Sequence, residues 1–333
     1  MGKNVWSFTK VTLALFLSSL GMIRGETFFG KPSGRASDGR LIIDFMSEEL
    51  GLTSYLRPYI YSLGFDSFSN GANFATGGSS IQKGGYSPFH LDVQISQFRQ
   101  FKARDIDIDN STQHEKGQNQ LYYPCKADLP KPEDFSKALY TFDIGQNDLA
   151  FGLGNSSENE TLASIPNILD LFSTAVQQLY SEGARVFWLH NTGPFGCLPD
   201  RNSKYPKKPG VLDKNGCVIP LNKIAQEFNM QLKSKLIQLK ASLTGAAFTY
   251  VDAYTAKFNL AKAQGFVDPL DFCCREKVVV NGTEHGGPCA NPTKHISWDG
   301  THYTEAANRW VSKFILNGSM SDPSIPINRA CHA

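Results

Sequence analysis

The stretch that decides the fold is residues 138–148, ALYTFDIGQND. Its first seven residues are mostly aromatic and aliphatic, and Gly145 and a group of polar side chains follow at once. A short apolar run that ends in turn residues predicts a buried β-strand. The polar residues Gln146, Asn147 and Asp148 then lie at the carboxyl end of that strand, which is where ligands bind in open α/β sheets.

Similar apolar runs recur along the chain and alternate with segments of helical periodicity. Further strands are predicted at residues 72–75, 185–190 and 247–251. Helices are predicted at residues 38–50, 91–102, 165–181, 220–243 and 304–316. This alternation predicts a parallel sheet with helices packed on its faces. With 333 residues, a hydrophobic content of 41% and no linker, the chain is expected to form one domain.

The N-terminus carries Lys3 and Lys10 and continues into an apolar run from Val11 to Ile23. This pattern predicts a secretory signal peptide over residues 1–21, which leaves residues 22–333 as the single domain. The run is too short to cross a bilayer, so we expect no stable membrane anchor. The formal net charge of +2 and the even mixing of signs give no field for nucleic acid.

Sequons and cysteines fit the same compartment. Five N-x-S/T sequons predict glycosylation at Asn110, Asn155, Asn159, Asn281 and Asn317. Seven cysteines follow the predicted signal, and an oxidising compartment favours disulfides with one cysteine left over. The alternative is a metal site made by the cysteines of residues 273–289 with His285 and His295. We disfavour it because the spacing matches no zinc pattern, and we expect no metal.

Near the C-terminus, residues 297–303 read SWDGTHY and place Asp299 three residues before His302. A hydroxyl nucleophile needs a neutral histidine as its base and a carboxylate that holds the imidazole in the right tautomer. Asp299 and His302 suit these two roles. The alternative is that Asp299 caps a helix that begins near Thr301 or Thr304, with His302 a polar residue of its first turn.

Two turns after predicted strands offer hydrogen-bond donors for an oxyanion. Residues 73–78, NFATGG, end in paired glycines whose backbone N–H groups can approach a ligand closely. The N–H of Gly78 and the side-chain amide of Asn147 together suit an oxyanion hole. The alternatives are a tight turn for the glycines and a helix cap for Asn147.

These segments together resemble the plant GDSL esterase/lipase family of the SGNH hydrolases, and within it the early-nodulin-like subgroup. The resemblance runs from Gly25 to about Pro326. It is carried by GETFF at residues 25–29, GRASDGR at 34–40, GANFA at 71–75, FDIGQND at 142–148, NTGP at 191–194 and SWDGTHYTEAANR at 297–309.

The resemblance implies a flavodoxin-like, three-layer α/β/α fold that cleaves carboxylic esters without a cofactor. It implies that His302 is the base, Asp299 the triad carboxylate, and Gly78 and Asn147 the oxyanion-hole donors, with Gly77 the less favoured register for the glycine. Serine attack, proton transfer through the histidine and hydrolysis of an acyl-enzyme follow in that order. The implied substrate is a small-molecule or polysaccharide ester, and the implied location is the extracellular space or the cell wall.

The sequence departs from the family at its front. The family opens its mature chain with a strand that leads into Gly-Asp-Ser, and no Gly-Asp-Ser occurs in this sequence. Ser37-Asp38-Gly39 has the letters reversed, Asp66-Ser67 lacks the preceding glycine, and Ser19 lies in the predicted signal. We assign none of them as the nucleophile. We expect the first strand of the sheet to be missing, or to be replaced by residues 11–19.

Three functions remain open. The first is a secreted ester hydrolase whose authentic transcript encodes a Gly-Asp-Ser segment between Gly21 and Gly25. The second is a non-catalytic secreted protein that binds esters or glycans. The third, ranked last, is a glycosidase, because the resemblance extends to a relative credited with fucosidase activity. It would need paired carboxylates drawn from Asp143, Asp148 and Asp299.

Overall fold

The computed structural model describes residues 5–9, 26–30, 33–52, 54–61, 68–114, 130–280 and 283–330. Its main sheet has seven strands in the order β2-β3-β1-β4-β5-β6-β9. All neighbours are parallel except β9, which runs antiparallel to β6. The strands β3-β1-β4-β5-β6 follow the flavodoxin-like order, as predicted. The bounds of the seven strands are β1 (Val5–Thr9), β2 (Arg57–Pro58), β3 (Ala72–Asn73), β4 (Leu139–Asp143), β5 (Val186–His190), β6 (Ala247–Val251) and β9 (Ser321–Asp322).

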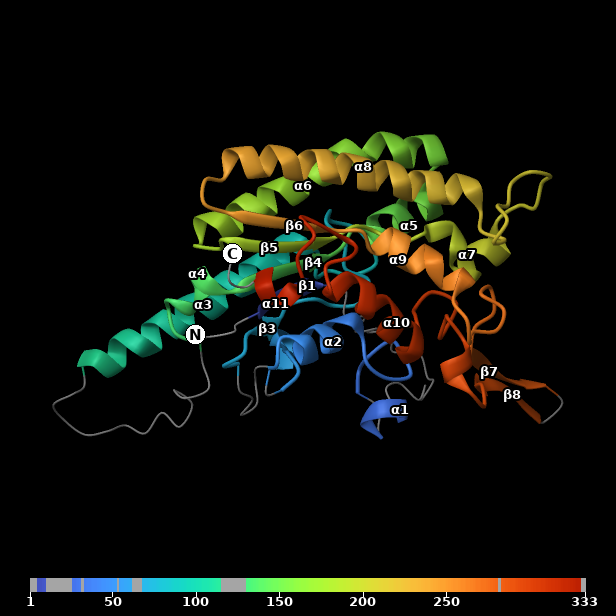
Figure 1. The fold of residues 1–333 in the computed structure, drawn as a ribbon, viewed down its shortest axis with the longest axis horizontal. Coiled ribbons are helices and arrows are strands. Elements are labelled where there is room, and N and C mark those ends of the chain that lie inside the picture. Colours follow the sequence, from blue (N-terminus) through green and yellow to red (C-terminus); the bar gives the residue numbers. More distant parts are fainter. Residues whose placement is uncertain are drawn as a thin grey trace.

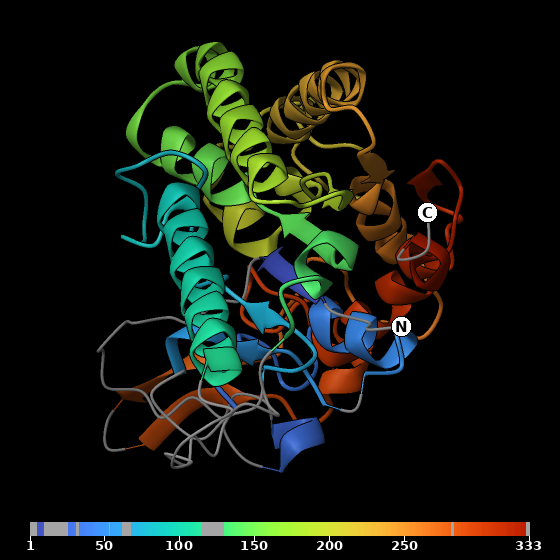
Figure 2. The same ribbon diagram turned by 90° about the vertical axis from the view of Figure 1, so that its left-hand side faces the viewer.

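Helices cover both faces of this sheet, which confirms the three-layer prediction (Figure 1). One face carries α3 (Leu91–His114), α6 (Glu158–Ser181) and α8 (Ile219–Ser242). The other carries α2 (Ile42–Glu49), α9 (Ala253–Phe258), α10 (Glu305–Leu316) and α11 (Ile327–Ala330). Figure 2 shows the same division after a quarter turn. The remaining α-helices of the described residues are α1 (Glu26–Phe29), α4 (Asp134–Lys137), α5 (Gln146–Asn155) and α7 (Pro199–Lys204).

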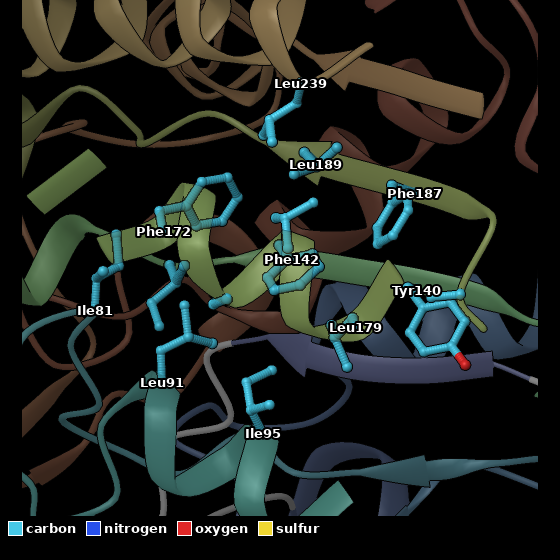
Figure 3. Packing of buried hydrophobic residues seen from close by; sticks show 14 of the residues in the cluster. Ile81, Leu91, Ile95, Tyr140, Phe142, Phe172, Leu179, Phe187, Leu189 and Leu239 are labelled. Carbon is cyan, nitrogen blue, oxygen red and sulfur yellow. The ribbon is translucent and has the colours of Figure 1, made fainter. Parts of the chain in front are cut away.

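The central strands bury side chains on both faces. Tyr140 and Phe142 of β4 pack with Phe187 of β5 in the core under α3, α6 and α8 (Figure 3). Leu139 and Trp188 point to the opposite core, under α2 and α10. Because both faces are covered, these strands read as continuous apolar runs instead of alternating ones.

Strand β1 lies inside the sheet, between β3 and β4. Ser7 pairs with Asn73 on one side, and Val5 to Thr9 pair with Leu139 to Asp143 on the other. The prediction that residues 11–19 replace the first strand is therefore wrong in position: residues 5–9, VWSFT, form it. Valine, tryptophan, phenylalanine and threonine all favour strands. This strand falls within the predicted signal peptide, which stays a prediction, and residues 11–19 lie outside the described residues.

Helix α6 begins earlier than the hydrophobic pattern predicted. Ser157 caps it, since its Oγ accepts a hydrogen bond from the Glu160 N–H at 3.2 Å. The Glu160 carboxylate accepts from the Ser157 N–H at 2.8 Å in return. This capping box satisfies two backbone N–H groups and starts the helix at Glu158, ahead of the apolar positions from residue 165.

A hairpin and two disulfides lie outside the main sheet. Strands β7 (Cys274–Val280) and β8 (Thr283–Pro288) pair antiparallel (Figure 1). Neither strand was predicted from the sequence. Disulfides join Cys197 to Cys217 and Cys273 to Cys289, which confirms the prediction for these four cysteines. The alternative metal site is wrong, because two of its thiols form the second disulfide. Cys125 and Cys331 lie outside the described residues.

The structure describes the asparagine side chains of three of the five sequons. Asn155, Asn159 and Asn317 are exposed. Asn110 lies in α3 without a described side chain, and Asn281 is outside the described residues. Glycosylation at all five stays a prediction. Among the described residues, every helix is too short or too polar to cross a membrane.

Candidate functional site

Asp299 and His302 lie together in the loop before α10. The Nδ1 atom of His302 is 2.7 Å from Oδ2 of Asp299. The other carboxylate oxygen accepts from the backbone N–H groups of His302 at 2.8 Å and Thr301 at 3.1 Å. In the neutral ring the proton is therefore on Nδ1, which donates it in a hydrogen bond to the carboxylate. Nε2 is then the nitrogen that can accept a proton.

The alternative in which Asp299 caps the helix is wrong. Helix α10 begins at Glu305, and its N-cap is Thr304, whose Oγ1 accepts from the Ala307 N–H at 3.2 Å. His302 therefore lies in the loop, outside the first helical turn. Residues 299–302 form a local turn that brings the carboxylate within hydrogen-bond distance of the imidazole.

The environment keeps Asp299 ionised. Burial acts to raise the pKa of its carboxyl, but the charge and hydrogen bonds of His302 and the Thr301 N–H outweigh burial and lower the pKa below 3.8. A carboxyl whose pKa is lowered by folding stabilises the folded protein when the pH is above the pKa of the unfolded state. This stabilisation is lost as the pH falls through the pKa of the folded state. Asp299 is thus a carboxylate throughout the neutral range.

The segment at residues 36–40 clamps the chain that follows His302. Ser37 Oγ donates to the Tyr303 carbonyl at 3.0 Å, and Asp38 accepts from the Glu305 N–H at 2.7 Å. The Arg40 guanidinium donates to the Glu305 carboxylate at 2.7 Å. Ser37 is fully buried with its hydroxyl committed here, which agrees with its rejection as the nucleophile. Ser19, Asp66 and Ser67 lie outside the described residues.

Substitution of Arg40 by leucine is expected to destabilise the protein by about 3 kcal/mol, because it leaves a buried carboxylate short of its main partner. Both side chains are 8% exposed. Burial acts to raise the pKa of Glu305, but hydrogen bonds from Arg40 and Arg309 lower it below 4.5. The contribution of Glu305 to the stability of the fold is therefore present when the pH is above 4.5 and is lost as the pH falls through the pKa of the folded state.

Urea unfolding of wild type and Arg40→Leu at neutral pH and at about pH 3 measures both effects. The difference in the free energy of unfolding between wild type and Arg40→Leu should be largest at neutral pH and smaller at about pH 3. Arg104→Leu, at an exposed position on α3, is the control and should stay within about 0.5 kcal/mol of wild type. Equal stability of Arg40→Leu and the control would show that the pair does not support this loop.

The turn that contains Gly78 is tied to the start of α5. The Asn147 amide donates to the Ser79 carbonyl at 2.7 Å. The Asp148 carboxylate, in a side chain that is 1% exposed, accepts from the N–H groups of Ile81 at 2.8 Å and Gln82 at 3.0 Å. One N–H of the Asn147 amide remains for a ligand, since a primary amide has two. The structure thus places Asn147, in the first turn of α5, beside the turn of Gly78; their role as oxyanion donors stays a prediction.

Glycine is needed at two points of this arrangement. Gly78 has a φ of +75°, and a Cβ there would lie 3.2 Å from Tyr86 Cβ. Gly145, the N-cap of α5, has a φ of +111°, and a Cβ there would lie 2.5 Å from the Phe228 ring. The left-handed backbone strains any other residue at both positions, and at Gly145 a Cβ would also clash with the Phe228 ring. Asn147 itself is not the cap, so that alternative is wrong.

A cleft with about 680 Å³ of empty space joins His302 to the carboxyl ends of the strands. It is lined by Asp143 at the end of β4, His190 at the end of β5 and Lys257 of α9, with Gln146 beside Asn147. Gly78 and Asn147 themselves do not line it. Neither His190 nor Lys257 was predicted as a site residue from the sequence. The one sequence signal was that His190 ends a predicted strand.

The sequence profile of the GDSL-like lipase/acylhydrolase family matches residues 21–315. The chain belongs to this family. A GDSL esterase/lipase of Arabidopsis thaliana is 48% identical over 92% of this chain and 82% of its own length. The Medicago truncatula GDSL esterase/lipase ENOD8 is 40% identical over 92% of this chain and 83% of its own length. The alpha-L-fucosidase 3 of Arabidopsis thaliana is 42% identical over 92% of this chain and 86% of its own length.

Membership makes the chain a carboxylic ester hydrolase by family and confirms the resemblance to the plant esterase/lipases. A putative acylhydrolase from Bacteroides fragilis matches with a TM-score of 0.34 and 13% identity, over 84% of this chain and 82% of that chain. At that level the likeness adds nothing to the family assignment.

Proposed function

We propose that this chain is built as a secreted carboxylic ester hydrolase of the acyl-enzyme type and lacks the nucleophilic serine of its family. The observation that carries the catalytic part is the hydrogen bond of 2.7 Å between His302 Nδ1 and the Asp299 carboxylate. Sequence supports the missing serine, since Gly-Asp-Ser occurs nowhere in the 333 residues.

The roles proposed here are those of the family's complete site, with its serine present as the attacking hydroxyl. Nε2 of His302 takes a proton from the attacking hydroxyl, and the ionised Asp299 stabilises the imidazolium that forms. The Gly78 N–H and the second N–H of the Asn147 amide donate to the oxygen that becomes negative in the tetrahedral intermediate. His302 then returns the proton to the leaving alcohol, and water hydrolyses the acyl-enzyme by the same route.

A second candidate function is the binding of esters or glycans without turnover. The missing serine favours it, because loss of the nucleophile from a comparable triad lowers turnover by on the order of 10⁶. The cleft beside His302 would then hold a ligand without cleaving it.

A glycosidase is not supported by the carboxylates, although one relative bears the name alpha-L-fucosidase 3. Asp148 is buried and holds the N–H groups of Ile81 and Gln82. Asp299 is committed to His302. Asp143 then has no second carboxylate among the three candidates with which to flank a sugar.

Treatment with a fluorophosphonate that labels activated serines tests the missing nucleophile. We expect the purified chain to stay unlabelled by intact mass, and its hydrolysis of p-nitrophenyl acetate to lie close to the buffer rate. Covalent labelling at a single residue, together with hydrolysis that His302→Ala abolishes, would contradict the missing serine. Peptide mapping would then identify the nucleophile.

A further inference from the structure

The turn at residues 297–303, which contains the proposed base and its carboxylate, is attached to the base of hairpin β7–β8. The Cys273 N–H donates to the Ser297 carbonyl at 3.1 Å. The Cys274 N–H donates to the Trp298 carbonyl. All four of these residues are buried, and a hydrogen bond is stronger in a buried environment than in water. The first two residues of the turn are therefore anchored to the hairpin.

A disulfide keeps the two donors in place. The bridge between Cys273 and Cys289 closes the base of the hairpin, and the Cys289 N–H donates to the Cys273 carbonyl at 2.8 Å. Strands β7 and β8 form a two-stranded sheet apart from the main sheet (Figure 1). Because a two-stranded hairpin alone is only marginally stable, the bridge is the main constraint that holds Cys273 and Cys274 against the turn.

Trp298 connects the bridge to the turn through its side chain. This residue is 1% exposed and lies in a buried cluster with Cys273 and Cys274, against which Cys289 packs. Its Nε1 has no hydrogen-bond partner among the described residues, so the indole contributes packing alone. The Trp298 backbone N–H donates to the His302 carbonyl at 2.7 Å and closes the turn. One residue thus contacts both the disulfide and the backbone of the proposed base.

Helix α7 holds the other side of Asp299. The Asp200 N–H donates to the Gly300 carbonyl at 3.0 Å. Gly300 has a φ of +91°, and a Cβ there would lie 3.4 Å from Asp200 Cβ. Asp299 therefore lies between two anchored carbonyls, those of Trp298 and Gly300. Since a hydrogen bond weakens steeply with misalignment, movement of either anchor would disrupt the 2.7 Å contact of Asp299 with the imidazole.

We infer that the Cys273–Cys289 disulfide and the Trp298 indole are positioning elements that hold the turn in the shape in which Asp299 contacts His302. Loss of the bridge should loosen the turn and leave the main sheet folded, because the hairpin lies outside that sheet. The catalytic meaning of this inference rests on the proposed function, since His302 needs this shape only as a base. The positioning itself is measured without turnover.

Amide hydrogen exchange of the full-length double variant Cys273→Ala/Cys289→Ala, followed by NMR, tests the inference. Both cysteines are replaced, so neither is left to pair with Cys274. The His302 N–H donates to the Asp299 carboxylate at 2.8 Å, and its exchange should quicken by at least about tenfold when the turn opens. The Leu232 amide in the middle of α8 should keep its wild-type rate.

The Nδ1–H proton of His302 gives a second reading, in protein labelled with ¹⁵N-histidine. In wild type its hydrogen bond to Asp299 slows its exchange with water, so the proton should give a resolved signal that His302→Gln removes. In the double variant the signal should broaden or disappear. A general loss of stability would not remove this signal from a protein that remains folded.

Removal of the other disulfide is the matched control. Cys197 and Cys217 are 20 residues apart, against 16 for Cys273 and Cys289, so the two bridges restrict the unfolded chain to a similar extent. Cys197→Ala/Cys217→Ala should quicken exchange of the His302 amide by less than about threefold. Equal acceleration by the two double variants would overturn the inference.

Trp298→Leu is the second test, and it keeps the bridge if the first double variant does not fold. It removes the indole without removing a hydrogen bond to the described residues, and it should quicken exchange of the His302 amide several-fold. Wild-type exchange of the His302 amide in Trp298→Leu, or in the folded Cys273→Ala/Cys289→Ala protein, would overturn the inference.

Failure of the proposed function has a different signature. Ester hydrolysis that His302→Ala leaves unchanged would remove His302 from catalysis, and the exchange rates would still decide whether the bridge positions the turn. Unchanged exchange rates would overturn the positioning role and leave the proposed function as it stands.

Discussion

Replacing residues 1–24 with the first strand and Gly-Asp-Ser loop of the family is expected to raise p-nitrophenyl acetate hydrolysis by on the order of 10⁶. The physical reason is that the chain already contains the proposed base, its carboxylate and the proposed oxyanion donors. Asp299 holds His302 at 2.7 Å, and Asn147 and the turn of Gly78 are joined through Ser79. The new strand would take the position of β1 between β3 and β4, with its serine at the carboxyl end of the sheet.

The matched control for this chimera carries alanine in place of the introduced serine. It has the same strand and loop, so a rate close to that of the unmodified chain would assign the gain to the hydroxyl. Equal rates for the chimera and its alanine control would contradict the view that one nucleophile is all that the site lacks.

Removal of residues 1–21, which cleavage of the predicted signal peptide would also cause, is expected to abolish the cooperative unfolding transition or to lower its midpoint temperature steeply, so the folded secreted protein would have to keep this segment. Strand β1 pairs with β3 on one side and with all five residues of β4 on the other. Its loss leaves buried N–H and C=O groups without partners, each at about 1–3 kcal/mol. A domain has about 5–15 kcal/mol of stability in total, so several such losses approach the whole.

Thermal unfolding followed by circular dichroism, with the full chain and the truncated chain side by side, makes the measurement. Deletion of Ile327 to Ala333 is the control at the other end, because it removes only α11 from the rim of the fold. An unchanged midpoint for the truncated chain would show that β1 is dispensable. It would also fit a mature protein that begins after the predicted signal.

Local sequence signals predicted the centre of the fold because each strand there is an unbroken apolar run. Residues 138–144 give β4 at Leu139–Asp143, and residues 247–251 give β6 with the same bounds. The position of β1 was missed for a physical reason. VWSFT favours a strand, but it lies among lysines and before a longer apolar run that has the pattern of a signal peptide. Which segment occupies the position between β3 and β4 depends on tertiary packing and is not encoded in the local sequence.

The candidate site shows the same limit. Asp299 and His302 were predicted because their contact spans three residues of sequence. Lys257 and Tyr303 carry no local signal, since their common position depends on α9 packing beside α10. Hairpin β7–β8 was also missed, and a disulfide between Cys273 and Cys289 holds its base.

The central claim is that His302, oriented by Asp299, is a working base that lacks only its nucleophile. The most direct measurement is the rate of p-nitrophenyl acetate hydrolysis by the Gly-Asp-Ser chimera with and without His302→Ala. We predict that the substitution lowers the rate by at least about 10³, as loss of the base does in a serine triad. A chimera that is active at the same rate without the imidazole would contradict the account.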